Sequence, residues 1–400
     1  MSRLALMGTS MYWTSPFQVG SHHIARELVR QGYQVAYLSD PVSPFRFLKS
    51  WTRAAWERYT LYQQHGEWYW KNKLWAYVPG ALLPPSNRRF LRSTWLHRNW
   101  WRFTHPFVTS VLERRGFREV DLLYLDNPRQ HFLMKQTNAQ KVIYRMADFN
   151  AGFRQCSPGE AKLEEEICQR ADLVIYPSKS LADRFTDANP KQSLVLPNGV
   201  NFDHFQADRP LPEEYKSISG PIAVYVGAID YWFDFDLMAR TANEMSELSF
   251  VIIGPDEKIP TRLSQLPNVH VLGTRPYESI PGYLQHADVG LIPFTVPEDC
   301  PDLVQCINPL KLYEYMACGL PVVSTEWDEI RSLNSPAHLC SSPEEFVLRL
   351  KAVLSSPEEK TRLRAYASTK SWQNRVSSLL QILNSSSIHE SLDFGYRKAG

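Results

Sequence analysis

The sequence predicts an α/β protein made of two Rossmann-like β/α/β domains that face each other across a cleft. Its 400 residues are more than one ordinary core supports. Short apolar runs alternate with amphipathic helical patterns through both halves, which is typical of mainly parallel sheets. A stretch rich in proline and acid, residues 208–219, separates the halves, and a new series of strand, loop and helix begins after it. Two such units in tandem leave a cleft where their strand ends face each other.

The first half opens with a βαβ pattern. Residues 4–7 indicate a strand, a loop rich in glycine, serine and threonine follows, and an amphipathic helix is expected from about Ser21 to Gln31. Gly32 ends that helix before the next strand. The remaining predicted strands of this half are short apolar runs at residues 34–38, 120–125, 141–144, 173–176 and 193–196.

The second half repeats the alternation, with strands predicted at residues 221–226, 248–253, 269–272, 289–293 and 321–324. We therefore assign residues 1–207 to the first domain and 208–383 to the second, with a Ser-rich tail at 384–400. An amphipathic helix over about 372–383 closes the second domain or packs back on the first.

Composition excludes several classes of protein and partner. The net charge of +2 gives no general argument for nucleic acid. Six scattered cysteines without metal spacing, and a start that lacks a signal peptide, favour a reduced cytoplasmic protein. Because no window approaches about 18 apolar residues, membrane contact is expected to be peripheral. Asp234-Phe-Asp236 imitates a DxD metal motif, but it stands where a helix begins, so we expect no required metal and no cofactor.

The most informative segment is NPLKLYEYMACGLPVV, residues 308–323, which predicts a helix and the strand after it. Asn308 can cap the helix, Pro309 suits its first position, and Gly319 suits its end. Amides at the helix start, with the charge of Lys311, can hold a diphosphate. Glu314 lies on the same face and can accept hydrogen bonds from a ribose. For an isolated Lys/Glu pair, an ordinary surface ion pair is the competing interpretation.

This string is similar to the donor-site helix of GT-B glycosyltransferases, and PNGVNFDHF from Pro197 resembles their inter-domain segment. Further matching segments cover nearly all of the chain: VIYPSKSLADRF, VGAIDYWFDFDLM, FVIIGP and NVHVLGTRPYESIPGYLQHADVGLIPF. Retaining members have an acidic residue eight positions before the equivalent of Glu314, where this chain has Cys306. The pattern instead resembles the GumK-like glucuronosyltransferases of exopolysaccharide assembly, which are inverting and use UDP-glucuronate.

The resemblance implies that Lys311 meets the donor diphosphate and Glu314 the ribose. We predict that the donor site also contains five residues of the matching segments: Gly227, Arg275, Phe294, Asn308 and Leu310. A glucuronate carboxylate needs a cation, which Arg275, Lys258 or another residue would supply. Glucose or another hexose remains an alternative donor sugar.

An inverting transfer needs a base near the acceptor. Asp148, in VIYRMADFNAGF, should lie at the carboxyl edge of the first sheet, where the GumK-like family has its base. The competing interpretation is that Asp148 caps the next helix. The loop after the first strand is predicted to contact the acceptor through Ser15, Gly20, His22 and His23. His22 or His23 is the rival candidate for the base.

Residues 46–102 form an insert with eleven Lys/Arg, two acids and eight of the twelve tryptophans. This mixture suits a lipid headgroup region. Single-stranded nucleic acid would use the same residue types, and individual tryptophans can simply fill the core.

Together these features predict an inverting, metal-independent transferase at the inner face of the cell membrane. It would move a sugar, glucuronate by preference, from a UDP-sugar to a lipid-linked glycan acceptor in surface polysaccharide assembly. The enzymatic alternatives are a retaining GT-B hexosyltransferase and a nucleotide-sugar epimerase. The non-enzymatic alternative is an assembly subunit that binds nucleotide sugar or lipid.

Overall fold

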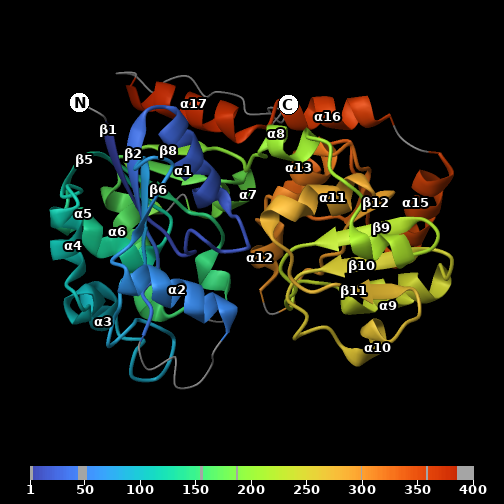
Figure 1. Cartoon of the computed structure of the whole chain (residues 1–400), viewed down its shortest axis with the longest axis horizontal. Helices are drawn as coiled ribbons and strands as arrows, with labels where there is room; N and C mark the ends of the chain where they lie inside the picture. Colours follow the sequence, from blue (N-terminus) through green and yellow to red (C-terminus); the bar gives the residue numbers. More distant parts are fainter. Residues whose placement is uncertain are drawn as a thin grey trace. The chain divides into compact units, whose positions relative to one another are not determined.

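A computed structural model describes residues 3–43, 52–153, 156–185, 188–298, 300–356 and 359–384. The chain divides into two compact units, Met1–Leu196 and Pro197–Gly400, each with its own sheet (Figure 1). The division falls before residue 207, where the sequence placed it. Residues 197–207 belong to the second unit because Phe205 is fully buried in its core and Gln285 Nε2 donates to the Phe205 carbonyl at 2.9 Å. The predicted tail, apart from Asn384, lies outside the described residues.

The first unit contains an eight-stranded sheet with the order β3-β4-β2-β1-β5-β6-β7-β8. All neighbouring strands pair in parallel except β3 with β4. The central strand β1 pairs with β2 on one side and β5 on the other, so the chain reverses its winding there. The strands of this sheet are β1 Arg3–Gly8, β2 Tyr33–Leu38, β3 Glu67–Tyr69, β4 Leu74–Tyr77, β5 Glu119–Leu125, β6 Asn138–Arg145, β7 Leu173–Tyr176 and β8 Ser193–Val195.

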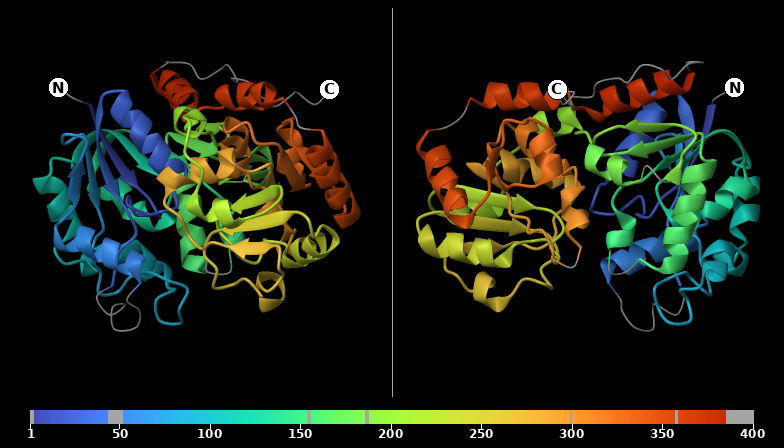
Figure 2. Two further views of the ribbon diagram at one scale, coloured as in Figure 1. Left: turned by 45° about the vertical axis from the view of Figure 1, so that its right-hand side comes forward. Right: turned by 180° about the vertical axis from the view of Figure 1, so that it is seen from behind.

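Helices cover both faces of this sheet (Figure 2). They are α1 Gly20–Arg30, α2 Arg53–Gln63, α3 Thr94–Asn99, η2 Trp100–Phe103, α4 Val108–Arg114, η3 Pro128–Phe132, α5 Leu133–Gln136, η4 Asn150–Gly152, α6 Pro158–Arg170 and α7 Lys179–Arg184. Over the described residues, no helix of either unit combines the length and apolar character that a bilayer span requires.

The second unit contains a six-stranded parallel sheet with the order β11-β10-β9-β12-β13-β14. Its strands are β9 Ile222–Val226, β10 Ser249–Ile253, β11 Val269–Val271, β12 Val289–Ile292, β13 Val322–Thr325 and β14 His338–Cys340. Its helices are α8 Phe202–Gln206, η6 Glu213–Ser217, α9 Phe235–Glu244, α10 Thr261–Ser264, η7 Tyr277–Ser279, α11 Ile280–Gln285, α12 Pro301–Gln305, α13 Leu310–Ala317, α14 Asp328–Ser332, α15 Pro343–Ser355, α16 Lys360–Ser368 and α17 Trp372–Asn384.

The predicted α/β class with two Rossmann-like units is confirmed, and every predicted strand is present. The sequence missed β3, β4 and β14. Strand β4 comes from the Trp-rich insert, and all four of its residues are buried beside β2. Part of the insert therefore belongs to the core: Trp75 and Trp100 are fully buried. Trp56, Trp70 and Trp95 of the same insert are exposed.

Candidate active site

In the second unit, the loop after β9 and the first turn of α13 meet at the carboxyl edge of the sheet. Gly227, directly after β9, has φ +146°, which side chains rarely adopt. A methyl group in its place would lie 3.1 Å from the Lys311 ammonium, so the ammonium packs directly on this loop. The structure thus brings together Gly227 and Lys311, which lie far apart in the sequence.

Two aromatic side chains surround the Lys311 ammonium. Its Nζ lies 3.3 Å from the Tyr225 hydroxyl, 4.7 Å from the centre of the Tyr225 ring and 4.5 Å from the centre of the Phe294 ring. Tyr225 in turn donates to the Ala228 carbonyl at 2.5 Å. Within the described ranges, no carboxylate lies within ion-pair distance of Lys311. An ammonium held by π faces and one hydroxyl remains available for an anion.

Helix α13 is held on the sheet by Tyr315, in its second turn. The Tyr315 hydroxyl accepts the Val226 N–H at 2.8 Å, and the Tyr315 ring packs where a side chain at Gly290 would stand. Only glycine at position 290 lets the helix approach β12 this closely. Leu310 is the first residue of the helix and is half-buried.

The sequence predicted that Asn308 caps the helix. This is wrong, because α13 begins at Leu310 and Pro309 occupies the cap position. The Asn308 side chain braces the helix entry instead. Asn308 Oδ1 accepts the Asn198 N–H at 3.1 Å, and Asn308 Nδ2 donates to Glu329 at 3.0 Å. The backbone enters helical geometry at Leu310, one residue later than the sequence suggested, and the bonds of Asn308 hold the segment that leads into the helix.

Burial shifts the pKa values of Lys311 and Glu314, the two charged residues of this helix. It lowers the pKa of Lys311 to about 7, and nearby Glu314 opposes that change. It raises the pKa of Glu314 to about 7, and Lys311 opposes the rise. Both groups are half-buried and, among the described residues, they form no direct ion pair. A diphosphate beside Lys311 would hold its proton and restore the full charge.

The other charged residues considered for the donor already have partners. Arg275 Nη2 lies 2.8 Å from Glu214, and its Nε donates to the Tyr283 hydroxyl at 3.1 Å. Lys258 Nζ lies 2.5 Å from Asp230. A role of Arg275 toward the sugar stays a prediction that would require this arrangement to open.

The two acids of the DxD-like motif have structural roles. Asp234 Oδ1 accepts the Leu237 N–H at 2.8 Å and caps α9, and Asp236 pairs with Arg262. The prediction that these acids favour a helix start is confirmed.

In the first unit, Asp148 follows β6 and lies at the carboxyl edge of the sheet. It does not cap a helix, because the residue before η4 is Phe149 and α6 is capped by Ser157. The carboxylate is exposed, and no hydrogen bond to it is present within the described part of the chain. Although Asp148 keeps exposed surface, the protein around it partly desolvates the carboxylate; this desolvation raises the pKa of Asp148 to about 6, and the Arg145 guanidinium opposes the rise.

Sequence reasoning missed Arg145 and Asp126, which lie at the ends of β6 and β5. The register Leu125↔Tyr144 places these next two residues side by side. The Arg145 guanidinium also packs on Gly20, where a methyl group would come within 3.1 Å of it. Burial raises the pKa of Asp126 to about 7, and Arg145 opposes the rise. Their position at the ends of predicted strands was the signal that could have found them. It was not sufficient, because the segments YLDNP, which contains Asp126, and YRMAD, which contains Arg145, resemble ordinary loop starts.

The predicted acceptor residues of the opening loop lie inward. Ser15 and His23 are buried, with 3% and 2% of their surface exposed. His22 Nδ1 accepts the Val19 N–H at 3.2 Å, which leaves Nε2 to donate to the Tyr12 carbonyl at 3.0 Å. Burial also lowers the pKa of His22 to about 4. His22 is therefore a neutral, fully bonded ring, and the acceptor role of this loop stays a prediction.

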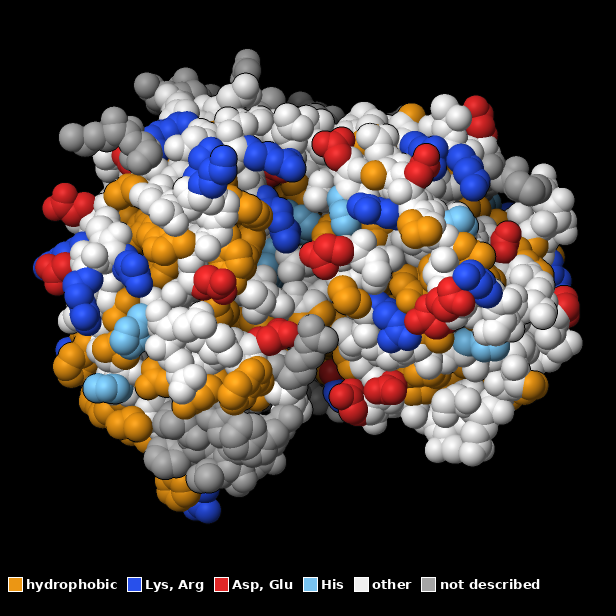
Figure 3. Space-filling model, viewed as in Figure 1, with side chains coloured by type: hydrophobic (Ala, Val, Ile, Leu, Met, Phe, Trp, Pro, Cys, Tyr) orange, Lys and Arg blue, Asp and Glu red, His pale blue; other side chains and the backbone are white. Residues whose placement is uncertain are grey.

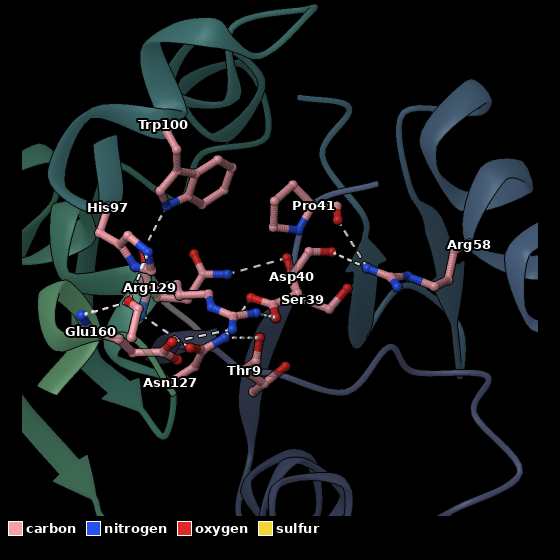
Figure 4. A network of polar contacts seen from close by, with 12 residues as sticks. Thr9, Ser39, Asp40, Pro41, Arg58, His97, Trp100, Asn127, Arg129 and Glu160 are labelled. Carbon is pink, nitrogen blue, oxygen red and sulfur yellow. Dashed lines mark hydrogen bonds and ion pairs between the residues drawn. The ribbon is translucent and has the colours of Figure 1, made fainter. Parts of the chain in front are cut away.

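A polar network fixes the other strand ends of the first sheet (Figure 4). Arg129 Nη1 lies 2.8 Å from Asp40, two residues after β2, and its Nη2 lies 3.2 Å from Glu160 of α6. Asn127, after β5, donates to Asp40 at 2.6 Å and to the Thr9 carbonyl at 3.3 Å. These bonds connect the ends of β1, β2 and β5 with α6. Burial acts to lower the pKa of Arg129, but the carboxylates of Asp40 and Glu160 outweigh it and raise the pKa.

Family models match each half of the chain. Residues 7–177 match the N-terminal domain of the glucuronosyltransferase GumK, and residues 220–356 match the glycosyl transferases group 1. A protein of Bacillus subtilis, TuaH, named for a glycosyltransferase role in teichuronic acid biosynthesis, is 28% identical over 182 residues. That match covers 43% of this chain and 45% of TuaH, so it spans less than half of the relative.

Solved structures share the whole architecture. Sucrose-phosphate synthase from Thermosynechococcus elongatus has a TM-score of 0.67 at 14% identity, covering 95% of this chain and 98% of that one. HepE from Anabaena, solved in complex with UDP, has a TM-score of 0.64 at 14% identity, covering 95% and 99%. At such identities the likeness concerns the fold alone. The two family models and this shared fold together place the chain among the GT-B glycosyltransferases, with a GumK-like N-terminal domain.

Proposed function

We propose that this glycosyltransferase moves a sugar from a UDP-sugar to an acceptor hydroxyl, with Asp148 as the base and Lys311 as the main contact of the diphosphate. The observation that carries the proposal is the Lys311 ammonium, which packs on the Gly227 loop between two aromatic rings and has no carboxylate partner in the described ranges. A dianionic diphosphate complements that charge. HepE, which shares the fold, was solved with UDP.

The proposed donor site extends along α13. The first amides of the helix, at Leu310 and Lys311, add partial positive charge to the phosphate position. Glu314, one turn further on, would accept hydrogen bonds from the ribose hydroxyls. Asn308 would act indirectly by holding the helix start, and Phe294 by closing one side of the Lys311 pocket.

The proposed reaction is an inverting displacement. Asp148 takes the proton of the acceptor hydroxyl while the acceptor oxygen bonds to the anomeric carbon. The bond between that carbon and the diphosphate oxygen breaks, and UDP leaves with the electron pair. Lys311 and the helix amides stabilise the charge that develops on the diphosphate, which is the work that a metal ion does in other transferases. The reaction is therefore proposed to need no metal or cofactor.

For the donor sugar we propose glucuronate, which the match to the GumK N-terminal domain supports. For the acceptor we propose a lipid-linked glycan of surface polysaccharide assembly, in keeping with the name of TuaH. A glucuronate carboxylate would need Arg275 or Lys258 to exchange its present carboxylate partner for the sugar.

We place peripheral membrane contact, on the inner face of the cell membrane, at an exposed apolar surface of the first unit. Nine large hydrophobic side chains are exposed among the described residues, and seven of them lie between residues 56 and 107: Trp56, Trp70, Leu82, Leu83, Phe90, Trp95 and Phe107. Phe90, 89% exposed, is flanked by Arg88, Arg89 and Arg92. In Figure 3 hydrophobic side chains gather on this unit in the region where Figure 1 draws α2 and α3. Aromatic and basic groups together favour an anionic lipid interface.

The donor and mechanism are tested by measuring nucleotide release in EDTA from UDP-glucuronate, UDP-glucose and GDP-mannose, with a membrane extract as acceptor. We expect turnover of UDP-glucuronate, a product of inverted anomeric configuration by NMR, and loss of activity in Asp148→Asn. Turnover that requires added metal, or a retained configuration, would contradict the proposal.

The membrane surface is tested by sedimentation with anionic vesicles. Phe90→Ser combined with Trp95→Ser should weaken vesicle binding by about tenfold or more, because apolar area no longer enters the interface. Leu348→Ser is the matched control, since Leu348 is 64% exposed in the other unit. Equal vesicle binding by the two variants would refute the surface.

A further inference from the structure

The segment that carries Asp148 is tied to the protein core through one buried carboxyl group. Glu164, on α6, is only 2% exposed. Its Oε1 accepts a hydrogen bond from Asn150 Nδ2 at 2.6 Å and another from the Tyr144 hydroxyl. Glu164 and Asn150 have no part in the proposed reaction itself.

The two donors stand on either side of Asp148 along the chain. Tyr144 belongs to β6, which precedes Asp148, and Asn150 begins η4, which follows it. Asp148 itself accepts no hydrogen bond within the described residues, so its carboxylate depends on the backbone around it for its position. Between Asp148 and Asn150, Phe149 packs its ring on Phe185 at 6.1 Å between centroids. The bond from Asn150 to Glu164 is a side-chain link between this loop and the buried face of α6.

We propose that Glu164 is a positioning residue for Asp148: through Asn150 it holds the loop that presents the carboxylate to the acceptor hydroxyl. This inference rests on the proposed role of Asp148 as the base. Proton transfer requires the base within hydrogen-bond reach of the proton, so a loop displaced by about 1 Å slows turnover without altering the donor site.

The chemistry of Glu164 suits a fixed anchor. Burial raises the pKa of Glu164 to about 7, while Tyr144 and Asn150 oppose the rise and Glu160 and Glu165 on the same helix add to it. Three further titratable neighbours interact with Glu164: Cys168 on the next turn of the helix, Cys156 and Tyr176. Because both bonds go to the same oxygen, either protonation state can keep that oxygen as an acceptor. A glutamine at this position supplies the same carbonyl oxygen.

The two bonds allow a matched test. Asn150→Ala removes the bond to the loop and leaves the bond to β6, whereas Tyr144→Phe removes the bond to β6 and leaves the loop attached. We expect Asn150→Ala to lower kcat by roughly ten- to hundredfold with the KM for UDP-sugar unchanged. Tyr144→Phe and Glu164→Gln should stay within about twofold of the wild-type kcat, and Glu164→Ala should behave like Asn150→Ala.

The pH profile separates positioning from mere support of the fold. With the loop released, Asp148 gains water, so its pKa should fall from about 6 toward the ordinary value and the acid limb of kcat/KM should move to lower pH. A purely structural role of Glu164 would reduce stability yet leave kcat per folded enzyme and the acid limb unchanged. If Glu164→Ala does not fold, the pair Asn150→Ala and Tyr144→Phe still decides.

Wild-type kcat and an unshifted acid limb in Asn150→Ala, with Asp148→Asn inactive, would overturn this inference and leave the proposed function intact. An equal loss in Tyr144→Phe and Asn150→Ala would also overturn it, because the strand bond would then matter as much as the loop bond. Full activity of Asp148→Asn would remove the proposed base, and this inference with it.

Discussion

Each of the two units has a cationic side chain at the carboxyl edge of its sheet, but only the one in the first unit is paired with carboxylates. In the first unit, Arg129 is bound by Asp40 and Glu160, and together they connect the strand ends. In the second unit, Lys311 lies against Tyr225 and Phe294, and no carboxylate within the described residues neutralises it. The first cation is part of the scaffold, whereas the second is available to a ligand.

The difference supports the proposed division of the transfer reaction between the two units. An uncompensated, partly desolvated ammonium favours an anion such as a diphosphate. In the first unit, the sheet edge carries an exposed carboxylate, Asp148, which can take a proton from a hydroxyl. Donor binding and acceptor activation are therefore assigned to different units, and variants can test each assignment separately.

The largest expected effect is that of Asp148→Asn. A general base contributes about 10²- to 10⁴-fold to the rate, so kcat should fall within that range while the KM for the UDP-sugar stays near the wild-type value. Initial rates of nucleotide release over a range of donor concentrations give both constants. A raised KM with unchanged kcat would assign Asp148 to donor binding and remove the division between the units.

Lys311→Met should have the next largest effect, and this effect should concern only the use of the UDP-sugar donor. A charge-assisted contact contributes about 1.5–3 kcal/mol, so kcat/KM for the UDP-sugar should fall by roughly ten- to hundredfold. Lys311→Arg keeps the charge and serves as the control. The same loss in both variants would mean that side-chain shape rather than charge matters there.

Arg129→Met should affect stability instead. It would leave Asp40 and Glu160 partly buried without their cation, at a cost of about 2 kcal/mol, below the value for fully buried pairs because Arg129 keeps some exposure to water. Lys311→Met should leave the free energy of unfolding unchanged or raise it, since it removes a desolvated cation. Urea unfolding of both variants measures this contrast, and equal losses would refute it.

The smallest effect concerns pH. Asp148, with its pKa raised to about 6, is protonated below that pH, so kcat/KM should fall on the acid side. Lys311, with its pKa lowered to about 7, loses its charge above that pH, so kcat/KM should also fall on the alkaline side, by about tenfold for each further unit. Lys311→Arg should remove the alkaline limb. An alkaline limb that persists in Lys311→Arg would have to arise from another group.

Periodicity and turn residues were enough to predict most of the strands, because buried parallel strands are short apolar runs with glycine or polar residues at their ends. They failed for β4, where Trp75 and Tyr77 appeared to be part of an amphipathic insert. Strand β14 was missed because His338-Leu339-Cys340 contains a single large aliphatic residue, so no apolar run marks it.

The arrangement proposed as the donor site was more predictable than that proposed as the acceptor site, for a physical reason. Lys311 and Glu314 share one helix, so their spacing alone places them on one face, and the end of β9 supplies Gly227. Tyr225 was missed because an apolar strand gives no sign of which hydroxyl faces an ammonium. In the first unit, Ser15 and His22 are polar residues that the loop uses to bond its own backbone.

The most direct test of the division between the units is calorimetric titration of UDP into the wild type, Asp148→Asn and Lys311→Met at pH 6.5. Asp148→Asn should bind UDP with the wild-type Kd, and Lys311→Met should bind it roughly tenfold or more weakly. Weakened binding by Asp148→Asn, or unchanged binding by Lys311→Met, would contradict the assignment of the diphosphate to the second unit.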